Sequence, residues 1–410
     1  MKKIKTKTAS ISILFEMLIC IFYMWYFLPA VNATLAAGFY KYIFFACYFG
    51  GMIGLFLLNG FKINKITVAV LLYFLMLTTL YLLNIGDAYK HIRVSFTFWG
   101  TALLYFGILN DSGRLRIGKL LFVLYIITCV TSSIGVVMDN SAARTLTHAA
   151  AEDMLQTSFR QKNIGCIYIF QSMVFWVPIL VCCPKKFWTK LLCSVLLAVV
   201  FFVLSNASFF ISIIVFFVAL LFSFATKQKS VGRMILVMVM CVLVILLYAI
   251  GHDLLTMLSD VVDNHRFAER IIGIRDLFYG GENAGDASVR MELYLVSLNT
   301  FLKKPFGVGP HYSYIYFVNG LGYHSQLFDD MARYGLFAIM FYALFFVGYY
   351  KHLKKNYDEI KNGRVAISLV VIYICFLALN LGFRSAEEGV LTLFIIPVVP
   401  LMIKYKKGSK

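Results

Sequence analysis

Apolar stretches recur along the whole chain and are separated mostly by short polar segments. A helix needs an apolar run of about 20 residues to cross the hydrocarbon core of a bilayer, and these stretches approach that length. Backbone exposed to lipid must satisfy its own hydrogen bonds, so the runs are expected to be helical. The pattern predicts an all-α membrane protein with twelve transmembrane helices, at about residues 10–29, 40–59, 66–84, 94–110, 118–138, 164–183, 189–205, 207–225, 234–251, 334–350, 365–383 and 388–403.

Two connections between the predicted helices are long, at about residues 139–163 and 252–333, and both fall on the same side of the membrane. Long ordered loops are usually functional. The chain therefore divides into residues 1–251 with transmembrane helices 1–9, an external loop at 252–333 expected to carry the chemistry, and residues 334–410 with transmembrane helices 10–12 and a cytoplasmic tail.

Composition agrees with a polytopic membrane protein, since 61% of the residues are hydrophobic, 14% are charged and the mean hydropathy is +0.81. The net charge of +18 is unevenly distributed. If the N-terminus is inside, 24 of the 38 Lys and Arg residues fall on the inner side, with only three acidic residues. This asymmetry follows the positive-inside rule and predicts that both termini are cytoplasmic. It accounts for the basic excess without nucleic acid, so no nucleic-acid partner is expected.

The first apolar run also fits a signal peptide, because lysines precede it and Ala30 to Ala33 follow it. The run is long for such a peptide, and its loss would break the alternation of charge, so a retained span is favoured. The nine cysteines lie in or at the ends of predicted spans and show no zinc-ligand spacing. They are interpreted as small apolar fillers.

Within the second long loop, residues 286–304 are predicted to form an amphipathic helix. Asp286 or Ser288 can cap its start, and Pro305 stops it. Its predicted apolar stripe consists of Met291, Leu295, Leu298 and Leu302. A turn at 307–310 follows the helix.

The most informative polar feature is His324, which precedes a predicted short helix that ends at Gly335, where an apolar span begins. An imidazole can take or give a proton near neutral pH. A lone His at a helix start is more often a surface or capping residue, so its neighbours decide the interpretation. Asp329 and Asp330 point different ways on this helix, and Asp329 can pair with Arg333.

Arginines in the two long loops are candidate phosphate ligands, because a guanidinium can donate two parallel hydrogen bonds. Arg290 lies in the first turn of a predicted helix, and Arg160 lies at the outer mouth of a span. Arg266 and Arg275 sit among acids, where surface ion pairs are the favoured interpretation. Four tyrosines before the His324 helix fit either sugar stacking or an aromatic belt at the membrane surface: Tyr312, Tyr314, Tyr316 and Tyr323.

The order of these motifs resembles the superfamily of O-antigen ligases and of O-antigen and capsular polysaccharide polymerases, which are bacterial polytopic membrane glycosyltransferases. In the family's pattern a His is followed by Asn, Ser or Gln, then by nine residues and a Gly. His324, Ser325 and Gly335 meet that spacing. Residues 159–165 also resemble the family's Pro-Asn region. The resemblance covers roughly residues 155–350.

The resemblance implies a metal-independent, GT-C-like enzyme that needs no cofactor. It would act on sugars carried by a polyprenyl diphosphate, such as undecaprenyl diphosphate, at the outer face of the bacterial cytoplasmic membrane. His324 would be the base that activates the acceptor hydroxyl, and Arg290 would hold the diphosphate. The expected substrate-binding residues are Arg160, Lys162, Asn163, Arg270, Ser325 and Tyr323.

One departure from the family is Phe209, which stands where members often carry an Arg at the outer start of a span. Either Arg160 or another loop Arg supplies that charge, or diphosphate binding differs here.

The favoured function is a polymerase of capsular, exo- or O-polysaccharide, with a chain-length regulator protein as a candidate partner. The alternatives are a ligase that moves a finished glycan to another acceptor, and a flippase or transporter of lipid-linked sugar. Transporters usually place ionisable groups at mid-membrane, whereas the predicted spans here contain little beyond Glu16.

Overall fold

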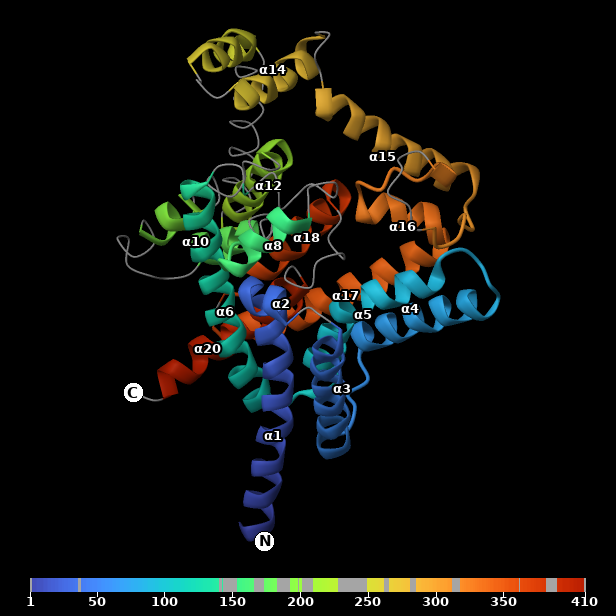
Figure 1. Ribbon diagram of the computed structural model, residues 1–410, viewed down its shortest axis with the longest axis vertical. Helices are drawn as coiled ribbons and strands as arrows, with labels where there is room; N and C mark the ends of the chain where they lie inside the picture. Colours follow the sequence, from blue (N-terminus) through green and yellow to red (C-terminus); the bar gives the residue numbers. More distant parts are fainter. Residues whose placement is uncertain are drawn as a thin grey trace.

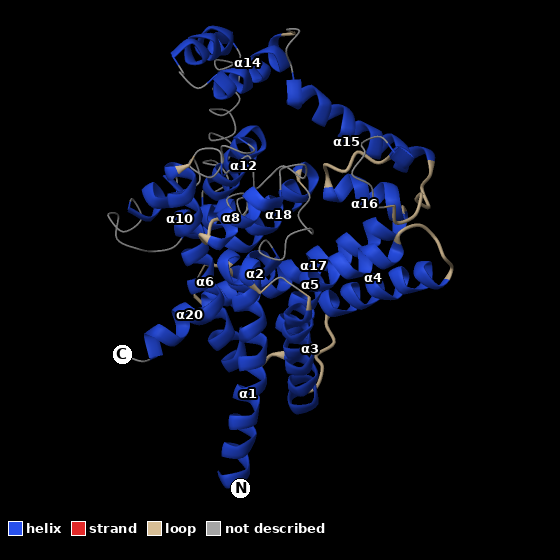
Figure 2. Cartoon of the chain, viewed as in Figure 1, coloured by secondary structure: helices blue, strands red, loops and turns tan. Residues whose placement is uncertain are grey.

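The computed structural model describes residues 2–35, 38–139, 142, 153–165, 173–182, 192–197, 199–200, 209–227, 249–261, 265–280, 285–311, 318–360, 362–380 and 389–408. In these ranges the protein is all-helical, with 86% helix and no strands (Figure 2). The all-α part of the predicted fold class is therefore confirmed for the described residues.

The N-terminal half begins with α1, which packs along α3 and α6. Figure 1 shows α1 and α3 side by side, with α4 and α5 extending to the right of them in this view. The elements of this half are α1 (Lys2–Phe27), α2 (Pro29–Thr34), α3 (Phe39–Asn59), α4 (Lys65–Leu82), α5 (Ala88–Ala102), the π-helical turn η1 (Leu103–Ile108), α6 (Asp111–Met138), α8 (Asp153–Gln161), the 3-10 turn η2 (Met173–Phe175), α10 (Trp176–Cys182) and α12 (Phe209–Lys227).

The C-terminal half carries the short helices of the second long loop. Here α15 packs on α16, while α16 packs on both α17 and α18 (Figure 1). The elements are α14 (His265–Tyr279), α15 (Gly285–Lys303), the 3-10 turn η4 (Val318–Gly320), α16 (Gln326–Tyr334), α17 (Leu336–Asp358), α18 (Val365–Leu379), the π-helical turn η5 (Leu391–Ile395) and α20 (Ile396–Gly408). Residues 249–261 are also helical.

Five described helices are long and apolar enough to cross a membrane: Ser10–Phe27, Phe39–Asn59, Lys65–Leu82, Asp111–Met138 and Leu336–Asp358. Shorter apolar helices lie at Met173–Cys182, Val215–Thr226, Val365–Leu379 and Leu391–Tyr405, each within or overlapping a predicted span. The predicted span at 94–110 falls on α5 and η1. Most of 189–205 and 234–251 lies outside the described residues, so the predicted count of twelve is not confirmed.

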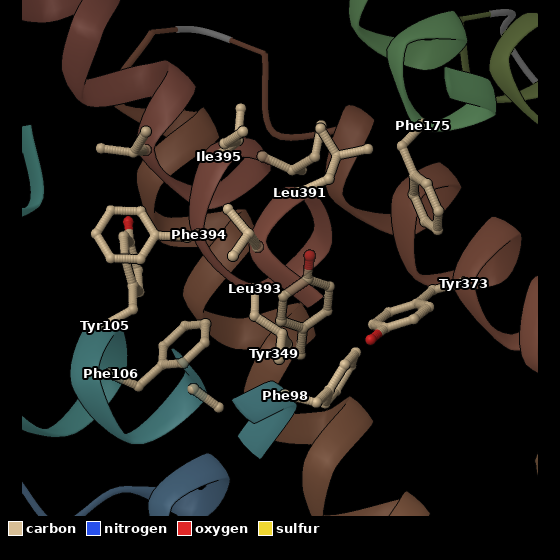
Figure 3. Packing of buried hydrophobic residues seen from close by; sticks show 14 of the residues in the cluster. Phe98, Tyr105, Phe106, Phe175, Tyr349, Tyr373, Leu391, Leu393, Phe394 and Ile395 are labelled. Carbon is tan, nitrogen blue, oxygen red and sulfur yellow. The ribbon is translucent and has the colours of Figure 1, made fainter. Parts of the chain in front are cut away.

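An aromatic core joins the helices that support the second long loop (Figure 3). The two π-helical turns meet there, because the rings of Tyr105 in η1 and Phe394 in η5 lie edge to face with centroids 4.9 Å apart. Phe175 and Tyr373 form a similar pair at 5.5 Å, and Tyr349 of α17 packs against Tyr373 at 5.7 Å. Edge-to-face aromatic pairs stabilise a core beyond their buried area. This core holds α17 and α18 together beneath α16.

Candidate functional site

Ser325 starts α16 and anchors it to the end of α18. Its hydroxyl accepts a hydrogen bond from the Phe328 amide at 3.1 Å, which caps the helix. The same hydroxyl donates to the carbonyl of Leu377 at 3.4 Å, and the Gln326 amide donates to the carbonyl of Asn380 at 2.9 Å. The short helix predicted after His324 is confirmed, and it ends at Gly335 as expected. Ser325 is only 1% exposed, so its structural role is capping.

His324 is half-buried and lies directly before this cap. Its Nδ1 is 3.2 Å from the carbonyl oxygen of Gly322. A carbonyl can only accept a hydrogen bond, so this contact requires Nδ1 to carry the proton. In the neutral ring the lone pair is then on Nε2, which is the form that a general base needs.

Arg290 lies half-buried in the first part of α15, near enough to Tyr294 for its charge to act on that hydroxyl. Burial raises the pKa of Tyr294, against the lowering effect of the Arg290 charge. The Tyr294 hydroxyl donates to the carbonyl of Leu379 at 2.9 Å. Tyr294, one turn after Arg290, and Ser325 and Gln326, directly after His324, are thus all bonded to residues 377–380 at the end of α18.

A buried ionic cluster lies on α16, downstream of His324. Asp330 accepts hydrogen bonds from Gln326 at 2.8 Å, from Tyr342 at 2.7 Å and from Arg333 at 3.2 Å. Burial raises the pKa of Asp330, although Arg333 acts in the opposite direction. The predicted ion pair between Asp329 and Arg333 was wrong, because Arg333 pairs with Asp330 instead. Against the lowering effect of burial, the charge of Asp329 still acts on Arg333 and raises its pKa.

Asp329 instead connects α16 to α15 and to the chain before His324. Its carboxylate accepts from the Ser297 hydroxyl at 2.6 Å and from the Tyr323 amide at 3.2 Å. Ser297 in turn accepts from the Gly322 amide at 2.9 Å. These bonds fix the backbone on which His324 is mounted.

The turn after α15 is built into the end of α16. The amides of Val308 and Gly309 donate to the carbonyls of Ala332 and Arg333, both at 3.0 Å. At Gly307 (φ +88°) a Cβ would lie 2.2 Å from the Arg333 carbonyl oxygen, so the close approach requires glycine. The glycine-rich turn noted in the sequence therefore closes α16 onto α15.

The boundaries predicted for the amphipathic helix agree with α15, but its predicted apolar stripe is not the packed face. Met291 is 53% exposed, and Leu295 and Leu302 are also exposed. The buried face instead carries Leu293 and Ser297. The hydrogen bond from Ser297 to the buried Asp329 is stronger in the low-dielectric interior, so it favours the helix rotation that buries Ser297.

The predicted residues of the first long loop lie on α8 and just after it. Here the Asn163 side chain accepts from the Ala30 amide and donates to Thr131, both at 3.2 Å. Asn163 has a φ of +60°, and it joins α2 to α6. Arg160 and Lys162 are exposed. In Figure 1, α8 lies beside α2 and apart from α15, so the structure does not bring Arg160 to Arg290.

Other predicted residues have different surroundings. Tyr323 is 3% exposed, and the guanidinium carbon of Arg333 lies over its ring, 5.4 Å from the ring centroid. Arg275 forms the expected ion pair, with Asp276 at 2.8 Å. The side chains of Arg266, Arg270, Asp286 and Ser288, and the residues Tyr312, Tyr314 and Tyr316, lie outside what the structure describes.

Tyr294 and Ser297 are site residues that the sequence pattern did not indicate. Both lie on the face of α15 that packs against α16 and α18, one turn apart from each other in sequence. A signal was present, because a Tyr four residues after Arg290 shares its helix face. The apolar pattern alone could not show which face of α15 is buried.

Fold and site together define a helical membrane protein in which α15 carries Arg290 and the residue before the cap of α16 is His324. Residues 191–343 match the family described as O-antigen ligase. The matched segment includes Arg290, His324 and the start of α17, and it confirms the predicted resemblance to the O-antigen ligase and polymerase superfamily. The match indicates a bacterial membrane enzyme that transfers glycosyl groups. No curated protein matches the chain.

Proposed function

We propose that the protein is a polysaccharide polymerase that joins oligosaccharide repeat units carried on a polyprenyl diphosphate. The observation that carries the proposal is that the segments bearing Arg290 and His324, both within the family match, are anchored to the same end of α18, through Tyr294 to Leu379 and through Gln326 to Asn380. The external position of residues 252–333 and the use of the outer membrane face belong to the same proposal.

In the proposed reaction, a hydroxyl of the acceptor sugar attacks the anomeric carbon of the donor sugar. A new glycosidic C–O bond forms, and the bond between the anomeric carbon and the diphosphate oxygen breaks. The hydroxyl proton moves to Nε2 of His324, whose tautomer is set by the Gly322 carbonyl. The polyprenyl diphosphate leaves with the bonding electron pair.

Arg290 is proposed to stabilise the negative charge that develops on the leaving diphosphate. A diphosphate is already a good leaving group, so charge neutralisation and orientation of the acceptor are the main tasks of the protein. The exposed Met291 and Leu295 lie on the same helix and offer apolar surface for the isoprenoid chain. Arg160, Lys162, Asn163, Arg270, Ser325 and Tyr323 remain proposed contributors to substrate binding.

The family description favours a second function, in which the enzyme is a ligase that transfers a finished glycan to another acceptor. Purified protein in detergent, given a polyprenyl-diphosphate-linked repeat and no energy source, distinguishes the two. A polymerase lengthens the lipid-linked oligosaccharide and releases one polyprenyl diphosphate for each bond formed. A ligase leaves this single substrate unchanged and acts only when a second acceptor is added. Neither product forms if the protein is a flippase.

A further inference from the structure

A cavity of about 500 Å³ lies at the opposite end of the helices from His324, on the side that the charge pattern assigns to the cytoplasm. It is open to one side and is lined by the starts of α4 and α6, the end of α17, and α20. Six basic side chains line it: Lys62, Lys65, Arg114, Lys351, Lys355 and Lys404. Only two acidic side chains do so, which leaves a large excess of positive charge.

Both acidic residues of the cavity are already neutralised. Asp111 pairs with Arg114 at 2.9 Å, and Glu359 pairs with Lys404 at 3.0 Å. Among the described residues, no carboxylate pairs with the other four lining lysines. Burial and then the charge of Arg114 lower the pKa of Lys62, as expected in a region of positive potential.

Part of the cavity wall is rigid. The Arg114 guanidinium donates to the Tyr105 carbonyl at 2.9 Å and lies over the Tyr105 ring, 4.8 Å from its centroid. Lys62 donates to the Leu109 carbonyl at 3.1 Å. These bonds hold the Arg114 and Lys62 cations at fixed positions. The ammonium groups of Lys65, Lys351 and Lys355 also line the cavity and can bind an anion there.

We infer that this cavity binds a phosphate ester, which is either the head group of an inner-leaflet phospholipid or a soluble phosphate compound. Several ammonium groups around one volume match an anion with several acceptor oxygens and one or more negative charges. The volume is within the range of small-molecule sites, about 300–1,000 Å³. Lysines that only orient the protein in the membrane do not need to surround one cavity. The inference is therefore tested by comparing lysines that line the cavity with lysines that do not.

The test compares two double variants that remove the same charge from the same predicted face. Lys65→Gln with Lys355→Gln removes two cavity lysines from α4 and α17. Lys119→Gln with Lys354→Gln removes two exposed lysines from α6 and α17 that do not line the cavity. Size-exclusion chromatography and thermal unfolding establish that both purified proteins are folded, and Lys351→Gln provides a second cavity variant.

Binding is measured with two probes that separate the two sources of phosphate. Inorganic diphosphate is titrated into purified protein by calorimetry, and lipids retained from nanodiscs of mixed phosphatidylglycerol and phosphatidylcholine are counted by mass spectrometry. We expect the cavity variant to weaken binding of at least one probe about tenfold or more, since hydrogen bonds to charged groups are lost. We expect the control variant to stay within about twofold of the wild type, because its two lysines are exposed like Lys65 and Lys355 but do not line the cavity. Loss of diphosphate binding identifies a soluble ligand, and loss of retained phosphatidylglycerol identifies a lipid. Equal losses in both variants, or no saturable binding of either probe, would overturn the inference.

Discussion

The two ring nitrogens of His324 have different tasks in the proposed reaction. Nδ1 is committed to the Gly322 carbonyl at 3.2 Å, which leaves the lone pair of the neutral ring on Nε2. Gly322 itself is held by Ser297, and Ser297 by Asp329. The tautomer of His324 is therefore set by bonds that begin in a buried carboxylate of α16.

At the same scale, Arg290→Lys should reduce glycosyl transfer nearly as much as Arg290→Ala. A lysine keeps the charge but lacks the planar fork that gives two parallel hydrogen bonds to a diphosphate. Initial rates with a lipid-linked repeat, at matched amounts of folded protein, measure the effect. Full activity of the Lys variant would show that the fork is not needed.

A control separates diphosphate binding from a structural effect on α15, since Arg290 lies near Tyr294. Tyr294→Phe removes the hydrogen bond from α15 to the Leu379 carbonyl and leaves the guanidinium. We expect Tyr294→Phe to retain most of the activity. If it is as damaging as Arg290→Ala, Arg290 acts by positioning α15 against α18, and the assigned role is wrong.

At the scale of elements, the short helices α15 and α16 form one unit with the glycine turn between them. The sequence indicated both helices and their ends through simple signals, such as Pro305 after α15 and Ser325 before α16. It did not indicate which face of α15 is buried. Apolar spacing favoured Met291 and Leu295, whereas the hydrogen bond between Ser297 and Asp329 determined the packing.

The turn can be tested with two glycines of similar backbone geometry. Gly307 has φ +88° and Gly280 has φ +82°, but a Cβ at Gly280 would meet nothing within 4 Å. Gly280→Ala should lower the free energy of unfolding by only about 1–2 kcal/mol, which is the penalty for a non-glycine residue with left-handed backbone geometry. Gly307→Ala should cost clearly more and should lower activity, because its Cβ would overlap the Arg333 carbonyl. Thermal unfolding in detergent measures the difference, and equal losses would contradict the proposed coupling of the turn to α16.

The buried ion pair of α16 offers another test, since an exposed pair with the same spacing serves as its control. Arg333 and Asp330 are 4% and 5% exposed, whereas Lys90 and Asp87 are 51% and 32% exposed. Arg333→Met leaves buried carboxylates without their cation and should cost about 3–5 kcal/mol of stability. Lys90→Met should cost less than about 1 kcal/mol. Denaturation in detergent compares them, and a mild effect of Arg333→Met would show that the carboxylates take up protons instead.

At the scale of the whole molecule, charge and hydropathy were enough to predict a helical membrane protein. Its sidedness stays a prediction, although four of the segments assigned to the inner side meet around one basic cavity. The number of transmembrane helices was harder to predict. Several apolar segments form helices shorter than a full span, and their length alone does not show whether they cross the membrane. The site was only partly predictable, since Asn163, Ser325 and Tyr323 are engaged in packing that depends on distant segments.

Topology gives a prediction at this scale. A peptide tag inserted after Gly280, in an exposed turn, should be accessible to antibody in intact spheroplasts. A tag after Lys410 should become accessible only when the membrane is permeabilised, because the inner side carries the excess of lysine and arginine. The reverse pattern would place residues 252–333 in the cytoplasm and remove the basis of the proposed reaction.

The most direct measurement is chain extension by purified His324→Ala protein given a polyprenyl-diphosphate-linked repeat. His252→Ala is the matched control, because His252 is exposed and pairs only weakly with Asp253 at 3.2 Å. The account predicts that the wild type and the His252 variant make lipid-linked products of increasing length, while the His324 variant, present at the same level and equally folded, makes none. Products of normal length from the His324 variant would contradict it.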